Sequence, residues 1–175
     1  MPPHCDALDG PVVQAARLAL ETGDVGFVLP YVPKTGEAEI ASTFARVSCA
    51  RQASAVARDV ADRYFFETVV RIHRAGEGAA FTGIKPAGLD VGPVIPAAEK
   101  AIASDDPTPL ADLLAEVVRG EVIDRFERLV HLRPAEGASV DDRRAYVETT
   151  LGLEVWAHGL YQAARAARHV GHVHA

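Results

Sequence analysis

The hydrophobic positions of this chain recur at helical spacing from one end to the other. The first apolar segment, VVQAARLALETG, follows Asp9-Gly10-Pro11 and stops at Gly23. We expect a helix that Asp9 caps, that has Pro11 at its first position, and that Gly23 ends. A second helix is expected from about residue 36 to about residue 51, with an apolar face formed by Ile40, Phe44 and Val47.

The segment 53–76 has the strongest helical pattern because no glycine or proline interrupts it before Gly76. Its apolar stripe contains Ala61, Phe65, Val69 and Ile72. The segment that follows, 77–95, is rich in glycine and proline, and we expect a long loop there. Loops of that length in compact proteins are often functional.

Three further helices are predicted after this loop. A short one follows Pro96, a long amphipathic one runs to about Leu132, and the last runs from Asp141 to about Arg168. The main apolar face of the last helix contains Tyr146, Leu153, Leu160 and Ala164. Because no segment alternates with the period of a strand, the pattern predicts an all-α fold: a helical bundle of four main helices, with additional short helices and one long Gly/Pro-rich loop.

The length of 175 residues favours one domain, which we place at 1–168. We expect the remaining segment, 169–175, to be a flexible tail, and its sequence HVGHVHA is rich in histidine. A histidine-rich tail can recruit metal ions weakly, and it can equally be an ordinary surface segment.

The formal charge of −6 and the interspersed arginines argue against binding to nucleic acid. No apolar run reaches membrane-spanning length, and no secretory signal pattern is present, so we expect a cytoplasmic protein without a membrane partner. In a reducing compartment, Cys5 and Cys49 are expected to be free thiols or metal ligands rather than a disulfide.

The candidate chemistry begins with His4, Cys5 and Asp6, which follow one another directly. A thiolate together with an imidazole favours zinc, copper, nickel or iron over calcium or magnesium. Removal of Met1 would leave His4 as the third residue, as in amino-terminal copper and nickel motifs, but Pro3 has no amide proton to lose. Coordination would therefore use side chains, and the alternative is a flexible N-terminus with a free thiol.

Two further sites have a residue pattern that suits a metal ligand. His73 lies at the edge of the apolar stripe of its helix, so it either satisfies its hydrogen bonds there or binds a ligand. Glu154 and His158 lie one turn apart, on the face opposite the main apolar face of the last helix. This face either packs against a second layer or is exposed to water.

The chain resembles an uncharacterised family, a domain of unknown function. Its members begin with an H-C-D-x-x-D-G-P-V-V segment, here His4 to Val13, and have a histidine-rich C-terminus. They also share an A-D-x-Y-F-F-E-T-x-V-R-I-H-R-x-G-E-G block and a T-G-x-K-P-A-G-x-D loop, here Ala61 to Gly78 and Thr82 to Asp90. The resemblance covers nearly the whole chain and implies no activity.

A fainter similarity links His4, Cys5 and Asp6 to nickel superoxide dismutase, a helical bundle whose mature chain opens with H-C-D. The nickel hook of that enzyme has a second cysteine, which is missing here, and two prolines precede the histidine in this chain. The similarity therefore implies a metal-binding His-Cys segment on a helical bundle rather than dismutase activity.

These observations lead to the hypothesis that the protein binds one transition-metal ion, of nickel, copper, iron or zinc. Cys5 and His4 would be ligands, completed by His73, Glu154 or His158. The ion would serve redox or Lewis-acid chemistry on a small molecule admitted by the 77–95 loop. Two alternatives stay open: a metal-free thiol enzyme with Cys5 as the catalytic nucleophile, and a non-catalytic interaction protein whose helices pack into a homo-oligomer.

Overall fold

The computed structural model describes residues 3–166, and this part of the chain is helical, with no strand. Its contacts divide it into two compact units, and the boundary along the sequence lies between residues 91 and 92. The prediction of an all-α fold is confirmed. The placing of residues 1–168 in one domain stays a prediction, and the tail at 169–175 lies outside the described residues.

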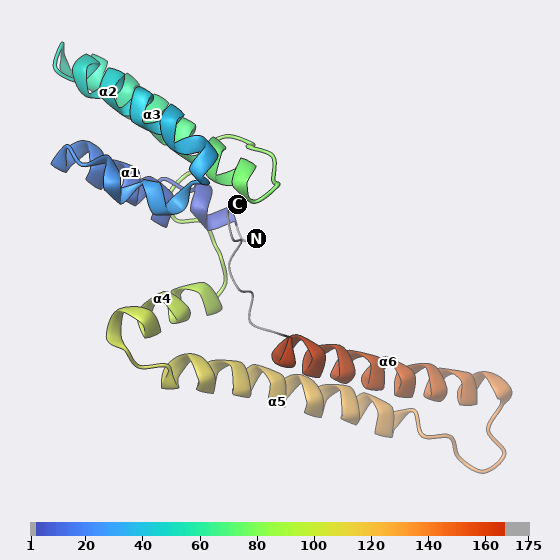
Figure 1. Ribbon diagram of the computed structural model, residues 1–175. Coiled ribbons are helices and arrows are strands. Elements are labelled where there is room, and N and C mark those ends of the chain that lie inside the picture. Colours follow the sequence, from blue (N-terminus) through green and yellow to red (C-terminus); the bar gives the residue numbers. More distant parts are fainter. Residues whose placement is uncertain (1–2, 167–175) are drawn as a thin grey trace. The chain divides into compact units, whose positions relative to one another are not determined.

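Unit 1 contains the helices α1, α2 and α3 together with short 3-10 helices (Figure 1). The α-helices are Pro11–Thr22, Glu37–Ala50 and Ala55–Gly76, and both α1 and α2 pack against α3. The 3-10 helices are η1 (Pro3–Asp6), η2 (Val25–Phe27), η3 (Leu29–Tyr31) and η4 (Lys34–Gly36).

The core of unit 1 is built around the apolar face of α3. Phe65 is fully buried, and its ring centroid lies 5.6 Å from that of Phe44 on α2. The predicted stripe is confirmed, because all four of its members are buried: Ala61, Phe65, Val69 and Ile72. The burial of Ile40 and Val47 confirms the predicted face of α2, where Phe44 is half-buried.

The predicted ends of α1 are correct, but the predicted cap is wrong. Pro11 lies in the first turn, and Gly23 ends the helix in the left-handed region at a φ of 77°, which glycine adopts without strain. The N-cap residue is Gly10, and no side chain caps the helix. Asp9 is engaged elsewhere: its Oδ2 accepts a hydrogen bond of 2.7 Å from the amide of Gly88, in the glycine-rich loop.

Unit 2 contains α4 (Val94–Ser104), α5 (Thr108–His131) and α6 (Val140–Arg165), with α5 in contact with both of the others (Figure 1). The short helix α4 begins at Val94, before the predicted start at Pro96. Ser139 caps α6 in a reciprocal arrangement with Asp142. Among the described residues of unit 2, only Leu129 is buried.

The side of α6 that faces α5 is marked by Trp156, whose ring lies 4.4 Å from the guanidinium carbon of Arg125 on α5. Three of the four residues on the predicted main apolar face are half-buried, namely Tyr146, Leu153 and Leu160, whereas Ala164 is exposed near the end of the helix. None of the helices in residues 3–166 is long and apolar enough to cross a membrane.

Candidate functional site

The N-terminal turn η1 is held on α3 by a buried ion pair. The Nε atom of Arg74 donates to Oδ1 of Asp6 at 2.7 Å, and these residues are only 5% and 4% exposed. A second nitrogen of the same guanidinium donates to Glu77 at 2.9 Å. Burial disfavours the charged form of Arg74, but the bond to Asp6 outweighs it, and the pKa of Arg74 is raised above its ordinary value.

The glycine-rich loop holds the same turn from another side. The amide of Lys85 donates to the carbonyl of Asp6 at 2.8 Å, and the amide of Leu8 donates to the carbonyl of Lys85 at 3.1 Å. These bonds form a short parallel bridge between the loop and the N-terminal segment. The N-terminal segment, the end of α3 and the glycine-rich loop therefore all contribute to this site.

Gly10 allows η1 to lie close against the start of α1. A Cβ atom at this position would lie 1.8 Å from the carbonyl oxygen of His4 and 2.9 Å from its carbonyl carbon. Both are backbone atoms, so no side-chain rotation relieves the clash. The residue must be glycine for a steric reason, because its φ of −77° is one that any residue adopts.

Substitution Gly10→Ala is therefore expected to displace η1 and to lower the free energy of unfolding by about 1–3 kcal/mol, the usual cost of overpacking. Urea unfolding measures the loss, and hydrogen exchange of the amides of Ala7 and Leu8 shows whether η1 has moved. Gly120→Ala is the control, since a Cβ there meets nothing within 4 Å. Equal stability of the two variants would contradict the close approach of η1.

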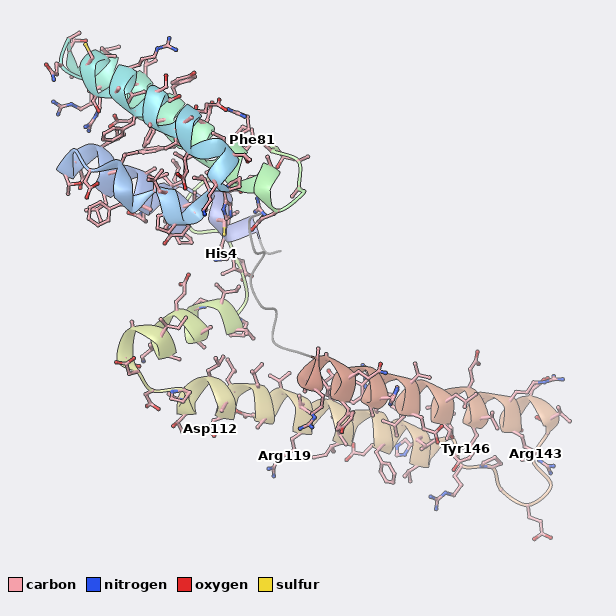
Figure 2. The ribbon with its side chains drawn as sticks, in the orientation of Figure 1. His4, Phe81, Asp112, Arg119, Arg143 and Tyr146 are labelled. Carbon is pink, nitrogen blue, oxygen red and sulfur yellow. The ribbon has the colours of Figure 1, made fainter. Side chains whose placement is uncertain are left out.

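Cys5 and His4 are adjacent in η1 and lie beside this ion pair. The Sγ atom of Cys5 lies 3.9 Å from Nε2 of His4. Cys5 is buried, and burial is the main reason that its pKa is raised above the ordinary value of a thiol; the nearby guanidinium of Arg74 opposes this shift. The thiol is thus protonated at neutral pH. Figure 2 labels His4 in unit 1.

His73, the third candidate ligand of unit 1, already has partners on the protein. Its Nδ1 lies 2.7 Å from the carbonyl oxygen of Tyr31, and its Nε2 lies 3.2 Å from Oε1 of Glu77. Glu77 thereby connects His73 to the ion pair of Arg74 and Asp6. Within residues 3–166, only Nδ1 is hydrogen-bonded, whereas the buried Nε2 has no hydrogen-bond partner and pairs with Glu77 only when the imidazole is protonated. The contacts therefore leave both interpretations of His73 open.

The remaining candidates, Glu154 and His158, are exposed on α6 in unit 2. Within residues 3–166, no three His, Cys, Asp or Glu side chains lie close enough together to hold a metal ion. The structure thus brings Cys5 together with His4. His73 instead contacts Tyr31 and Glu77, and Glu154 and His158 lie in the other unit.

Sequence reasoning missed Arg74 and Glu77, which join η1 to α3. A signal was present, because Arg74 follows Phe66 and Val70 at helical spacing and so occupies an apolar position of α3. A charge in such a position indicates a buried partner of opposite charge. The sequence gives no indication of which carboxylate provides it.

These features define a class of all-α protein in which a short N-terminal turn with a His-Cys pair is clamped by a buried arginine. The chain belongs to a family of unknown function, DUF6448, whose model matches residues 9–156. The match begins at Asp9, beyond the end of η1 at Asp6, and extends into α6, so it covers parts of both units. No curated protein and no solved structure matches the chain.

Proposed function

We propose that the protein binds one soft transition-metal ion through the imidazole of His4 and the thiolate of Cys5. The observation that carries this is the distance of 3.9 Å between the two donor atoms. Bonds of about 2.3 Å to sulfur and about 2.0 Å to nitrogen place such donors about 3.5 Å apart at a tetrahedral angle and about 4.3 Å apart when linear. The observed separation lies between these limits, so the spacing of the two atoms is compatible with both of them binding one ion.

The clamp around η1 supports the same function. Two consecutive ligands on a free chain end lose much conformational entropy when they bind an ion together. Here Arg74, the bridge to Lys85 and the contact at Gly10 hold η1 before any ion arrives. The cost of ordering the ligands is therefore met by folding, which favours tight binding.

The chemistry of the donors narrows the choice of ion. Thiolate and imidazole together favour copper(I) or zinc over magnesium or calcium. Because burial raises the pKa of Cys5, the ion must displace a proton, and its affinity falls as the pH is lowered. Asp6 is bound to Arg74, and Nδ1 of His73 is bonded to the carbonyl of Tyr31, so His73 would join as a ligand only through Nε2, in place of its contact with Glu77.

Two protein ligands leave open positions on the ion, as redox or Lewis-acid catalysis requires. A small-molecule substrate is part of this proposal. The thiol-enzyme alternative is less favoured by the same observations, since a nucleophilic cysteine needs a lowered pKa and access, whereas Cys5 is buried and its pKa is raised.

Anaerobic titration of the untagged protein with zinc or copper(I), against a chromophoric chelator, tests this function. The chain should end at residue 168 in every sample, which removes the histidines of the tail. We expect one equivalent of metal in the parent and at least about a hundredfold weaker binding in Cys5→Ser and in His4→Ala, because each removes one of two ligands.

Cys49→Ser is the matched control, because Cys49 is a free thiol on the exposed surface of α2. It should bind like the parent. Cobalt(II) gives a second readout, a sulfur-to-metal charge-transfer band that Cys5→Ser abolishes and Cys49→Ser keeps. Absence of stoichiometric binding in the parent, or full binding in Cys5→Ser, would show that the proposal is wrong.

A further inference from the structure

α6 has a second apolar stripe on the side that points away from α5. Val140, Val147 and Leu151 are 63%, 53% and 53% exposed. They lie roughly opposite Leu153 and Trp156, which are half-buried on the side toward α5. Exposed apolar residues gathered on one face of a helix commonly mark an interaction surface.

The stripe continues along α6 with the spacing of a coiled-coil seam. The residues that share this face are separated by four, three, four, three and four positions: Val140, Arg144, Val147, Leu151, Glu154 and His158. This alternation is the heptad pattern by which two helices pack side by side. All six are exposed, and Val140, Arg144, Val147 and Leu151 line a shallow groove at the start of the helix.

We propose that the stripe binds the same stripe of a second copy of this chain, with the two α6 helices antiparallel about a two-fold axis. The seam of a coiled coil is formed by two alternating positions of the heptad. In an antiparallel pair, a residue at the first position packs against a residue at the second position of the other helix, and each such pair forms one layer of the seam. Val147 then lies opposite Leu151 of the second copy, and Arg144 lies opposite Glu154 of the second copy. The axis repeats each layer, so the seam has two apolar layers at its centre, two opposite-charge layers flanking them, and two outer layers in which Val140 lies opposite His158 of the second copy.

The charges select this arrangement over the others. A parallel pair would place Arg144 on Arg144 and Glu154 on Glu154, and like charges in a seam are unfavourable. A slip of one heptad in the antiparallel pair sets Arg144 against Val147 in one direction and Leu151 against Glu154 in the other. The first of these slips still pairs Val140 with Leu151, but only the proposed register pairs Val147 with Leu151 and Arg144 with Glu154 together. This self-complementarity identifies a second copy as the partner.

This interaction is independent of ion binding in unit 1, and it gives Glu154 and His158 a different role from that of metal ligands. It is tested with the full chain by sedimentation equilibrium between about 1 and 200 μM, the range in which weak dimers dissociate. We expect a monomer–dimer equilibrium. Glu154→Arg, which sets arginine against arginine twice, should raise the dissociation constant at least about tenfold, and so should Arg144→Glu.

The double variant Arg144→Glu/Glu154→Arg restores opposite charges across the seam and should return the dissociation constant to within about threefold of the parent. Glu136→Arg, in the exposed loop before α6, makes the same charge change outside the seam and should have no effect. Circular dichroism confirms that each variant is folded. A parent that stays monomeric, single variants that still dimerise like the parent, or a double variant that does not recover would each overturn the proposal.

Discussion

Substitution Arg74→Ala is expected to lower the free energy of unfolding by about 3–5 kcal/mol, the usual cost of removing one partner of a buried ion pair. The loss is large because Asp6 would be left as a buried carboxylate without its guanidinium, and Glu77 would lose the same partner. Urea unfolding measures the change. Hydrogen exchange should locate the largest loss of protection in η1 and at the end of α3.

The matched control is Arg71→Ala, one turn earlier on the same helix. Arg71 forms an ion pair with Glu39, but these side chains are 47% and 54% exposed. Exposed pairs contribute about 0–1 kcal/mol, because water and salt screen them. If Arg74→Ala were no more destabilising than Arg71→Ala, the buried pair would not be what anchors the N-terminal turn.

Substitution Phe65→Ala is also expected to lower the free energy of unfolding by about 3–5 kcal/mol. Phe65 is fully buried at the centre of unit 1, and its truncation removes the ring contact with Phe44 and leaves a cavity that the surrounding helices fill only in part. The urea midpoint and slope measure the loss, since an unchanged slope shows that stability alone has changed.

Tyr64→Ala, at the neighbouring position, removes an aromatic ring that is about half exposed. It should change the free energy of unfolding by no more than about 0.5 kcal/mol. A similar loss in both variants would mean that the helical register of α3 is different from the one described.

Phe65 and Arg74 differ in how much of their role can be predicted from the neighbouring sequence. The position of Phe65 follows from the spacing of apolar residues along one helix, so its burial was predicted correctly. The role of Arg74 was not predicted, although its place among apolar positions was visible. Its partner Asp6 lies 68 residues away, and no local pattern connects the two.

In the candidate site, too, some features follow from neighbouring residues and others depend on how the helices pack. The donor chemistry of His4 and Cys5 follows from their adjacency, and it is the basis of the proposed ion binding. The contribution of His73, Glu154 or His158 depended on which helices approach η1. In the structure, His73 is held by Tyr31 and Glu77, and the other two lie in unit 2.

The sequence by itself determined that the chain is helical, and most helix boundaries and the apolar face of α3. These properties arise from interactions within a few turns, such as the rigid ring of Pro11, the left-handed freedom of Gly23 and the spacing of Ala61, Phe65 and Val69. Only the tertiary structure decided that the N-terminal turn is clamped by Arg74 and the loop at Lys85, and that Gly10 must lack a side chain. Those outcomes depend on contacts between distant segments, which are fixed when the helices pack together.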